Sequence, residues 1–259
     1  MSLIIKEIHD NIGVITLNDP KRLNSLSAEI IEEIITAFKE FKVQKLRAVV
    51  LKAMKGVNVF SAGHNVRELP MGIIDPLTYG DPLRQVIRTI QKHPCPVIAM
   101  IEGSVWGGAC EMVMSCDILI ASDKSTFAIT PAKLGVPYDI VGVLNFMKSV
   151  NLPLIKEILF TAQPISAARA VSIGMINHAV PIEELEKTTA DMLSIIIKNA
   201  PLAISVMKEE LRVLSNAIQL NPNAFEKIQS GRRHVYNSSD YKEGLQAFFD
   251  KRKPVFKGE

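Results

Sequence analysis

The sequence predicts an α/β core followed by a helical C-terminal region. Two observations carry this prediction: short apolar runs alternate with helical patterns over roughly the first two-thirds of the chain, and helical patterns dominate afterwards. Strands that alternate with helices indicate βαβ units and a largely parallel sheet. At 259 residues, the chain is long enough for one large domain with a substantial buried core.

Four short apolar runs are predicted to be strands of the core: Ile12–Leu17, Leu46–Leu51, Val97–Ile101 and Ile118–Ala121. After the first run, Ser27 can cap a helix, because its side chain can accept a free N–H of the first turn. Apolar residues then recur at helical spacing, at Ile30, Ile31, Ile34, Ile35, Phe38 and Phe41. A Gly-rich, helix-like segment separates the last two strands.

Helical patterns cover most of the remaining chain. They include Ile182–Lys198, Leu202–Leu220 and Tyr241–Lys251, and prolines stand at the expected starts or breaks. We therefore place the α/β core at residues 1–200 and the helical region at residues 201–259. Such a region can cover an active site or form a subunit interface.

The composition argues against several classes of protein. Thirty basic and 27 acidic residues leave a net charge of +3, too small to indicate a nucleic acid or a membrane surface as partner. The apolar stretch Val97–Ala121 is interrupted by three acidic residues, and charges appear early at the N-terminus, so neither a membrane span nor a signal peptide is expected. Cys95, Cys110 and Cys116 form no CxxC pair and fit a reducing compartment. We expect a cytoplasmic enzyme.

Two Gly-containing segments mark the expected site. They are Val59–Asn65 and Glu102–Met112, and each follows a strand-like run. Glycine lets the backbone approach a ligand closely, and a strand-to-helix turn presents unpaired N–H groups to negative charge. Either segment alone is well explained as a tight turn in the core. Their occurrence together favours two N–H donors around one oxyanion.

The sequence resembles the crotonase (enoyl-CoA hydratase/isomerase) superfamily along nearly its whole length. The resemblance rests on Lys21–Leu26, Phe60–His64, Gly107–Gly108, Cys116–Asp117 and Lys251–Pro254. It implies a crotonase-like (ClpP/crotonase) fold with repeated ββα units, a C-terminal trimerisation region and a homotrimer or homohexamer. It also implies that the oxyanion amides are those of His64 and Gly108.

Further segments resemble the branch of this family that converts methylmalonyl-CoA to propionyl-CoA and carbon dioxide. These segments are Gly103–Gly108, Thr130–Pro131, Gly135–Tyr138 and Lys208–Leu214. One departure from the family is Asn65, where many relatives carry Asp. This change leaves the backbone amide of His64 available.

The carboxylates that the sequence offers argue against enoyl-CoA hydration. The family uses two carboxylates for hydration; Glu111 aligns with the first, and an ungapped alignment places Pro131 at the second. Proline cannot act as an acid or a base. Loss of carbon dioxide needs no base, because the thioester oxygen accepts the electrons as an enolate that two amides can stabilise.

The remaining candidates would handle the departing carboxylate and the proton. Tyr138 can orient the carboxylate through its hydroxyl, and Thr130 can donate a second hydrogen bond. Glu111 can protonate the enolate or satisfy a buried backbone group, and all three residues also fit plain structural roles. Only the backbone N–H of His64 is used here, although its imidazole could border the pocket. We assign no chemistry to Trp106 or the cysteines, and we expect no metal.

The resemblance also implies how CoA is bound. Backbone groups around Ala62 and His64 would meet the adenine, Lys21 or Arg22 beside Leu23 would lie near the phosphates, and Lys253 would reach a neighbouring subunit's CoA or stay in a solvated tail. No separate cofactor is expected, because CoA enters within the substrate. The alternatives are another acyl-CoA reaction, such as hydrolysis or isomerisation, and a non-catalytic acyl-CoA- or RNA-binding protein. The modest charge argues against RNA.

Overall fold

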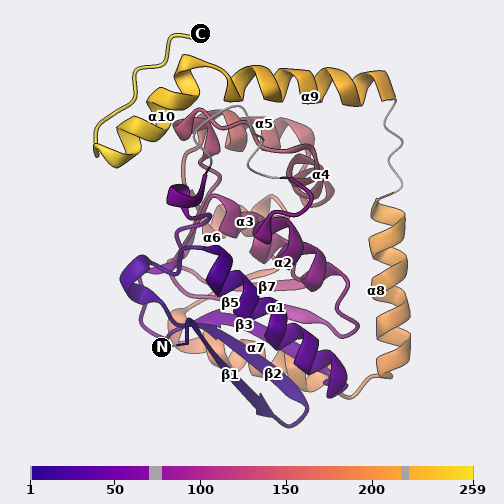
Figure 1. Cartoon of the computed structure of the whole chain (residues 1–259). Coiled ribbons are helices and arrows are strands. Elements are labelled where there is room, and N and C mark those ends of the chain that lie inside the picture. Colours follow the sequence, from indigo (N-terminus) through magenta and orange to yellow (C-terminus); the bar gives the residue numbers. More distant parts are fainter. Residues whose placement is uncertain (1, 70–77, 217–221, 259) are drawn as a thin grey trace.

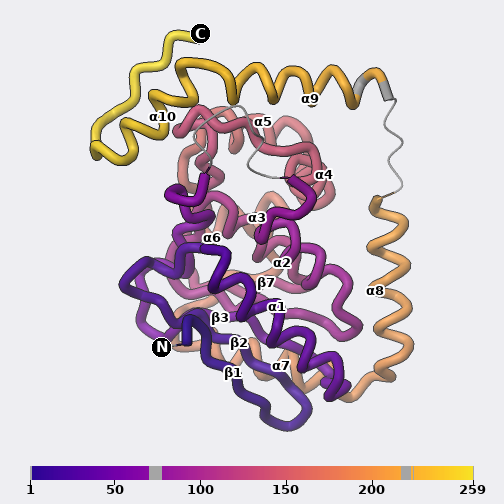
Figure 2. Tube along the Cα trace, in the orientation of Figure 1, coloured from indigo at the N-terminus to yellow at the C-terminus, as the bar shows by residue number. Residues whose placement is uncertain are grey.

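The computed structural model describes residues 2–69, 78–216 and 222–258. Two sheets form its centre, helices pack around them, and the last helices lie at the periphery (Figures 1 and 2). The larger sheet has the strand order β1-β2-β3-β5-β7-β10. Its strands are β1 (Ile4–His9), β2 (Ile12–Leu17), β3 (Ala48–Ala53), β5 (Val97–Ile101), β7 (Ile118–Ser122) and β10 (His178–Val180).

The centre of this sheet is parallel, as the alternation of strands and helices predicts. Only β1 pairs antiparallel, with β2. The four strands predicted from apolar runs are β2, β3, β5 and β7, and their near-continuous apolar character is typical of strands buried on both faces. Strand β1 is an edge strand, and only its first residue, Ile4, is buried. Its sequence therefore shows little of the apolar pattern that marks the buried strands.

The smaller sheet positions the site. Its order is β4 (Val59–Ser61), β6 (Ser104–Trp106), β8 (Thr126–Ala128) and β9 (Ile165–Ser166). The first three strands are parallel to one another. Because the carboxyl ends of parallel strands meet at one edge, the segments that follow β4, β6 and β8 gather there.

Helices cover both faces of the larger sheet. Helix α7 (Ile182–Ile196) packs its Leu185 and Leu193 on one face. The main core lies on the other face, under α1 (Ala28–Val43), α2 (Pro82–Gln91) and α3 (Gly108–Met114). Ser27 caps α1 by accepting from the Ile30 amide, as predicted. The core helices are completed by α4 (Ile140–Ser149), α5 (Leu152–Thr161) and α6 (Ala167–Ser172).

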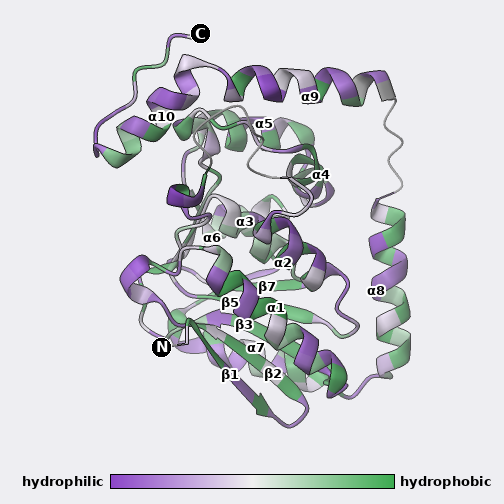
Figure 3. Ribbon diagram, in the orientation of Figure 1, coloured by the Kyte–Doolittle hydropathy of each residue, from purple (hydrophilic) through white to green (hydrophobic). Residues whose placement is uncertain are grey.

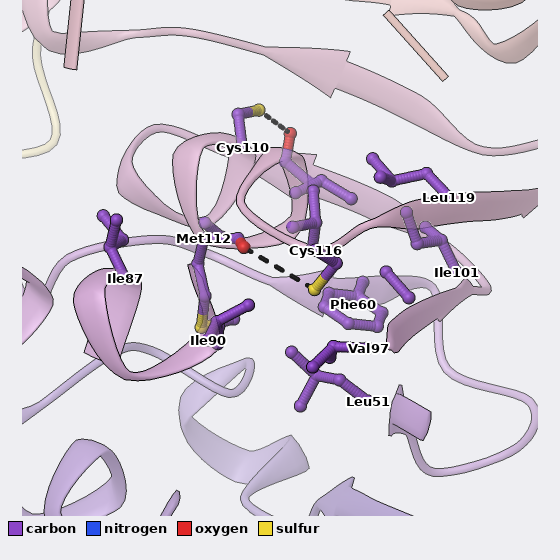
Figure 4. Close-up of a cluster of buried hydrophobic side chains, with 14 of the residues drawn as sticks. Leu51, Phe60, Ile87, Ile90, Val97, Ile101, Cys110, Met112, Cys116 and Leu119 are labelled. Carbon is purple, nitrogen blue, oxygen red and sulfur yellow. Dashed lines mark hydrogen bonds between the residues drawn. The ribbon is translucent and has the colours of Figure 1, made fainter. Parts of the chain in front are cut away.

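The cysteines belong to the buried core. Figure 4 shows Cys110 and Cys116 among Phe60, Val97 and other apolar side chains. All three cysteines are free and buried. Burial raises the pKa of Cys110 to about 12, so this thiol stays protonated at neutral pH and acts as an apolar packing group.

The C-terminal helices are α8 (Pro201–Ser215), α9 (Pro222–Tyr236) and α10 (Ser239–Phe249). The helix predicted at Leu202–Leu220 thus ends at Ser215, and residues 217–220 lie outside the described part of the chain. Helix α8 runs along one side of the molecule, and Lys208 ties it to the core through an ion pair with Asp117 at 2.7 Å (Figure 1). Among the described helices, none is long and apolar enough to span a membrane alone. Helices α7 and α8 reach that length and hydropathy only when taken together, and the two are bent by 105° relative to each other.

Acid should destabilise the fold through His93. This side chain is 4% exposed and packs edge-on against Phe38, and burial, with Lys208 and Lys42 nearby, lowers its pKa to about 4. Because the unfolded chain binds this proton near pH 6.5, stability is complete above that pH and falls as pH drops toward 4. We expect a loss of about 2 kcal/mol by pH 5. Denaturant unfolding of the wild type and of His93→Gln at a series of pH values would measure this loss. We expect the unfolding free energy of the variant to fall less on acidification. Parallel pH dependences of the two unfolding free energies would contradict the role of His93.

Candidate active site

Two backbone turns meet where β4 and β6 end. Gly63 has φ +84° and Gly107 has φ +52°, conformations that favour glycine. A Cβ added at Gly63 would lie 2.4 Å from the Trp106 carbonyl oxygen and 3.1 Å from the Gly108 amide nitrogen. A side chain at Gly63 would therefore separate the two turns, and glycine is what lets them touch.

The amides of His64 and Gly108 are available to a ligand. The first turn is held by other groups: Leu26 donates to the Gly63 carbonyl, and the Asn65 amide donates to Leu26. Within the described part of the chain, neither the His64 N–H nor the Gly108 N–H donates to a protein acceptor. A Cβ added at Gly108 would lie 3.6 Å from the His64 nitrogen. Two unpaired donors therefore lie close together, as the sequence predicts.

Both turns open into a pocket of about 80 Å³. Its lining is mainly apolar: Ala62, His64, Val66, Leu69, Leu83, Gly107, Gly108, Thr130, Pro131, Leu134, Val136 and Tyr138. A cavity needs about 10–15 Å³ to hold one water molecule, so this pocket has room for roughly six groups of that size. The structure thus brings four of the predicted catalytic residues, His64, Gly108, Thr130 and Tyr138, around one small space.

Tyr138 lines this space and carries an unpaired, buried hydroxyl. Among the described residues its buried oxygen has no hydrogen-bond partner, and its ring packs edge-on against Phe146 with centroids 5.1 Å apart. Burial, together with the charge of Glu111, raises the Tyr138 pKa well above its usual value. The hydroxyl therefore stays protonated and can donate. Thr130 lies nearby, since a Cβ added at Gly107 would be 3.4 Å from its Oγ1.

Glu111 lies outside the pocket lining, in a buried ion pair. Its two carboxylate oxygens accept from the two terminal nitrogens of Arg84, and Asn145 donates to Oε1 at 2.9 Å. Arg84 also lies 3.0 Å from Asp139. Burial alone would lower the pKa of Arg84, but the hydrogen bond and charge of Glu111, with the charge of Asp139, raise it overall. This geometry favours the structural interpretation of Glu111 over that of a proton donor.

Sequence reasoning missed Arg84, although a signal was present. Arg84 lies on the buried stripe of α2, with Leu83, Val86, Ile87 and Ile90. A charged residue on the apolar face of a helix requires a buried partner of opposite charge. That requirement points to an acidic residue elsewhere in the core, and Glu111 and Asp139 are those residues.

The His64 side chain anchors the turn that carries its amide. Nδ1 lies 3.2 Å from the Asn65 carbonyl oxygen, and Nε2 lies 3.5 Å from Asp81, whose carboxylate also caps α2. Asn65, the departure from the family pattern, accepts from the Arg67 amide and donates to Glu68. These contacts give both side chains a local structural role.

Most of the residues expected to bind CoA lie together. The Ala62 amide donates to the Leu23 carbonyl at 2.9 Å, which places Lys21, Arg22 and Leu23 beside the first turn. Lys253 follows α10 in an exposed tail. No hydrogen bond or ion pair between described residues joins Lys253 to that group, so its reach toward CoA stays a prediction.

Two further groups can be checked at this site, a metal-binding cluster and the second carboxylate of a hydratase. No group of three or more His, Cys, Asp or Glu side chains that could hold a metal occurs among the residues that the structure describes. Pro131 lines the pocket at the start of the turn Pro131–Leu134. The position that the alignment gives to a second hydratase carboxylate is therefore in the pocket and carries no carboxylate.

Two turns with free amides close together, where the parallel strands of the smaller sheet end, form the geometry expected of an enzyme that stabilises an oxyanion. The chain belongs to the enoyl-CoA hydratase/isomerase family, whose model matches residues 7–259. The resemblance and the crotonase-like fold inferred from sequence are thereby confirmed.

Within the family, the similarity to methylmalonyl-CoA decarboxylases is extensive. The chain is 50% identical to methylmalonyl-CoA decarboxylase of Escherichia coli (strain K12) over 249 residues, 96% of this chain and 95% of the relative. A solved structure of methylmalonyl-CoA decarboxylase in complex with 2-nitronate-propionyl-CoA matches with a TM-score of 0.97 and 49% identity, covering 99% of both chains. Another, complexed with 2S-carboxypropyl CoA, matches with a TM-score of 0.98 and 48% identity, covering 100% of this chain and 99% of the other.

Proposed function

We propose that this protein decarboxylates methylmalonyl-CoA to propionyl-CoA. The observation that carries the proposal is that the free His64 and Gly108 amides meet at one small, mainly apolar pocket, which is also lined by Tyr138, a residue with an unpaired buried hydroxyl. None of the described lining residues is a carboxylate. The pocket thus supplies donors for a negative oxygen and offers no acid–base pair for hydration.

The two amides carry the bond-breaking step. As the C–C bond to the carboxylate breaks, its electron pair moves to the α-carbon and on to the thioester oxygen, and carbon dioxide leaves. The His64 and Gly108 N–H groups donate to this oxygen, which becomes more negative in the transition state. Such donors stabilise the transition state more than the ground state, and each is worth about 3–4 kcal/mol in comparable sites.

The apolar pocket and Tyr138 set the geometry of the leaving group. The C–COO⁻ bond must stand roughly perpendicular to the thioester plane, so that its electrons can enter the carbonyl system. The Tyr138 hydroxyl can hold the carboxylate in this orientation, and Thr130 lies where a second hydroxyl can assist. The apolar lining favours departure of the carboxylate, because it hydrates that group poorly, while the negative charge moves to the thioester oxygen that the two amides stabilise. A proton then adds to the α-carbon.

A substrate panel tests this function directly. The purified protein would be incubated with methylmalonyl-CoA, malonyl-CoA and crotonyl-CoA, and products identified by mass spectrometry. We expect propionyl-CoA from the first and no 3-hydroxybutyryl-CoA from the last. Hydration of crotonyl-CoA, or release of free CoA without decarboxylation, would instead assign one of the other acyl-CoA reactions.

Tyr138→Phe should slow decarboxylation about 10–100-fold, because hydrogen bonds to charged groups are worth about 1.5–3 kcal/mol. The same change should leave the fold as stable or stabilise it, since it removes a buried hydroxyl that has no partner among the described residues. Steady-state kinetics, propionyl-CoA binding and denaturant unfolding would be compared. An unchanged rate would remove Tyr138 from the mechanism. A parallel loss of stability would indicate a structural role instead.

The CoA portion and the assembly belong to the same proposal. Backbone groups around Ala62 and His64 would receive the adenine, and Lys21 or Arg22 the phosphates, with Lys253 reaching a neighbouring subunit's CoA. We propose a homotrimer or homohexamer assembled through residues 201–259. Exposed apolar side chains on α8 support it: Leu202, Val206, Met207, Leu211, Val213 and Leu214. Figure 3 shows green, hydrophobic stretches along the ribbon of α8. A cytoplasmic location is also proposed, and the three buried free thiols fit a reducing compartment.

A further inference from the structure

A second and larger cavity lies behind the proposed reaction pocket. It measures about 640 Å³ and lies between α2, the start of α4 and α9. Its walls include Ile87 and Gln91 of α2, Val141 of α4 and Phe225 of α9. A space of this size and partly apolar character could hold an alkyl chain several carbons long.

Two pairs of adjacent residues separate the two cavities. Leu83 lines the small pocket, and the next residue, Arg84, lines the large cavity. Likewise Tyr138 lines the small pocket, and Asp139 lines the large cavity. The wall between the two spaces is therefore built at the start of α2 and just before α4.

A buried charge cluster fills this wall. Arg84 is 3% exposed, Glu111 is fully buried and Asp139 is 6% exposed. Arg84 binds Glu111 with both terminal nitrogens and lies 3.0 Å from Asp139. Each charge therefore has an opposite charge beside it, which is the condition for keeping it buried.

The cluster abuts the back of Tyr138 without a gap. A Cβ added at Gly142 would lie 2.2 Å from the Tyr138 ring and 2.9 Å from Oε2 of Glu111. Not even a methyl group fits at that position. The Tyr138 ring, which lines the small pocket, and the Glu111 carboxylate thus both lie against Gly142, and Arg84 links that carboxylate to the large cavity.

We propose that the Arg84–Glu111–Asp139 cluster acts as a partition that sets the size of the acyl group. This inference rests on the proposed function and adds its substrate class: malonyl-type thioesters with a 2-substituent of one or two carbons. A longer substituent would have to displace a paired, buried charge, which is far costlier than displacing an apolar side chain. Arg84 and Glu111 are specificity-determining residues in this account and touch no reacting atom.

The wild type alone provides the first test. Calorimetry would measure the binding of propionyl-, butyryl-, hexanoyl- and octanoyl-CoA, which cannot lose carbon dioxide. We expect affinity to fall about tenfold or more for each methylene that the pocket cannot hold. Equal affinity for propionyl- and octanoyl-CoA would overturn the partition. Because binding needs no turnover, this result is independent of whether methylmalonyl-CoA is decarboxylated.

Three variants separate size from charge. Arg84→Ala with Glu111→Ala empties the wall, and we expect the ratio of octanoyl-CoA to propionyl-CoA affinity to rise at least tenfold. Arg84→Met with Glu111→Gln removes the charge pair but keeps its bulk, and should raise this ratio by less than the alanine pair does, because the uncharged wall still fills the space but is easier to displace. Val141→Ala enlarges only the large cavity and should change nothing. An unchanged ratio in a folded alanine double variant, or an equal rise in Val141→Ala, would overturn the proposal.

Discussion

Gly108→Pro should slow methylmalonyl-CoA decarboxylation by about 10²–10³-fold, the cost of losing one oxyanion donor. Proline replaces the N–H by a ring carbon, so the donor is lost and the ring adds bulk at this position. The first position of a helix tolerates proline, because the N–H there has no partner within the helix. The rate constant at saturating substrate should carry most of the loss, because this hydrogen bond strengthens as the enolate forms.

Gly108→Ala is the matched control for this change. Its new Cβ would lie 2.7 Å from Cδ2 of Leu83, the end of a flexible side chain that can move. Alanine therefore adds much of the steric burden of proline and keeps the N–H. We expect Gly108→Ala to retain most of the activity that Gly108→Pro loses. If both variants lose activity equally, with the fold intact by circular dichroism, the shape of the turn matters and the amide does not.

Arg84→Met should cost about 3–5 kcal/mol of unfolding free energy, because it leaves the buried carboxylates of Glu111 and Asp139 without their cation. Arg84→Met combined with Glu111→Leu should recover much of this loss, since a well-packed apolar pair can replace a buried ion pair. Denaturant unfolding of the single and double variants forms a thermodynamic cycle. Losses that simply add would show that the two residues are not coupled.

The deficit of Arg84→Met should also grow with pH. In the wild type, burial and the charge of Glu111 raise the pKa of Asp139, and Arg84 opposes this shift. A carboxylate with a raised folded pKa stabilises the fold at low pH and loses that contribution as pH rises through the folded value. Without Arg84 the shift is larger, so the variant should be closer to the wild type at pH 5 than at pH 8. A constant difference would contradict this reasoning.

The sequence pattern predicted those elements whose structure depends mainly on residues close to one another in the chain. The strands β2, β3, β5 and β7 are near-continuous apolar runs, and α1 has an apolar stripe and a serine cap, so both kinds of element were predictable. The two turns were predictable from their glycines and from the family resemblance. The smaller sheet was not predicted, because strands of two or three residues carry too little periodicity to recognise.

The features that sequence could not supply depend on distant residues. Glu111 was a candidate proton donor because of its aligned position, and only the fold shows both its oxygens held by Arg84, 27 residues away. Likewise no local pattern shows that the Tyr138 hydroxyl lacks a partner among the described residues, or that Arg84 and Leu83 face different cavities. These are consequences of which strand ends and helix starts the topology brings together.

The polarisation of the thioester carbonyl in the bound state is the most direct measure of the oxyanion donors. Infrared difference spectra of propionyl-CoA carrying ¹³C at the thioester carbon would be recorded free, bound to the wild type, and bound to Gly108→Pro and Gly108→Ala. We expect the carbonyl band to move to lower frequency on binding, to return part of the way in Gly108→Pro, and to stay low in Gly108→Ala. A band at the solution frequency in the fully bound wild type would contradict the account.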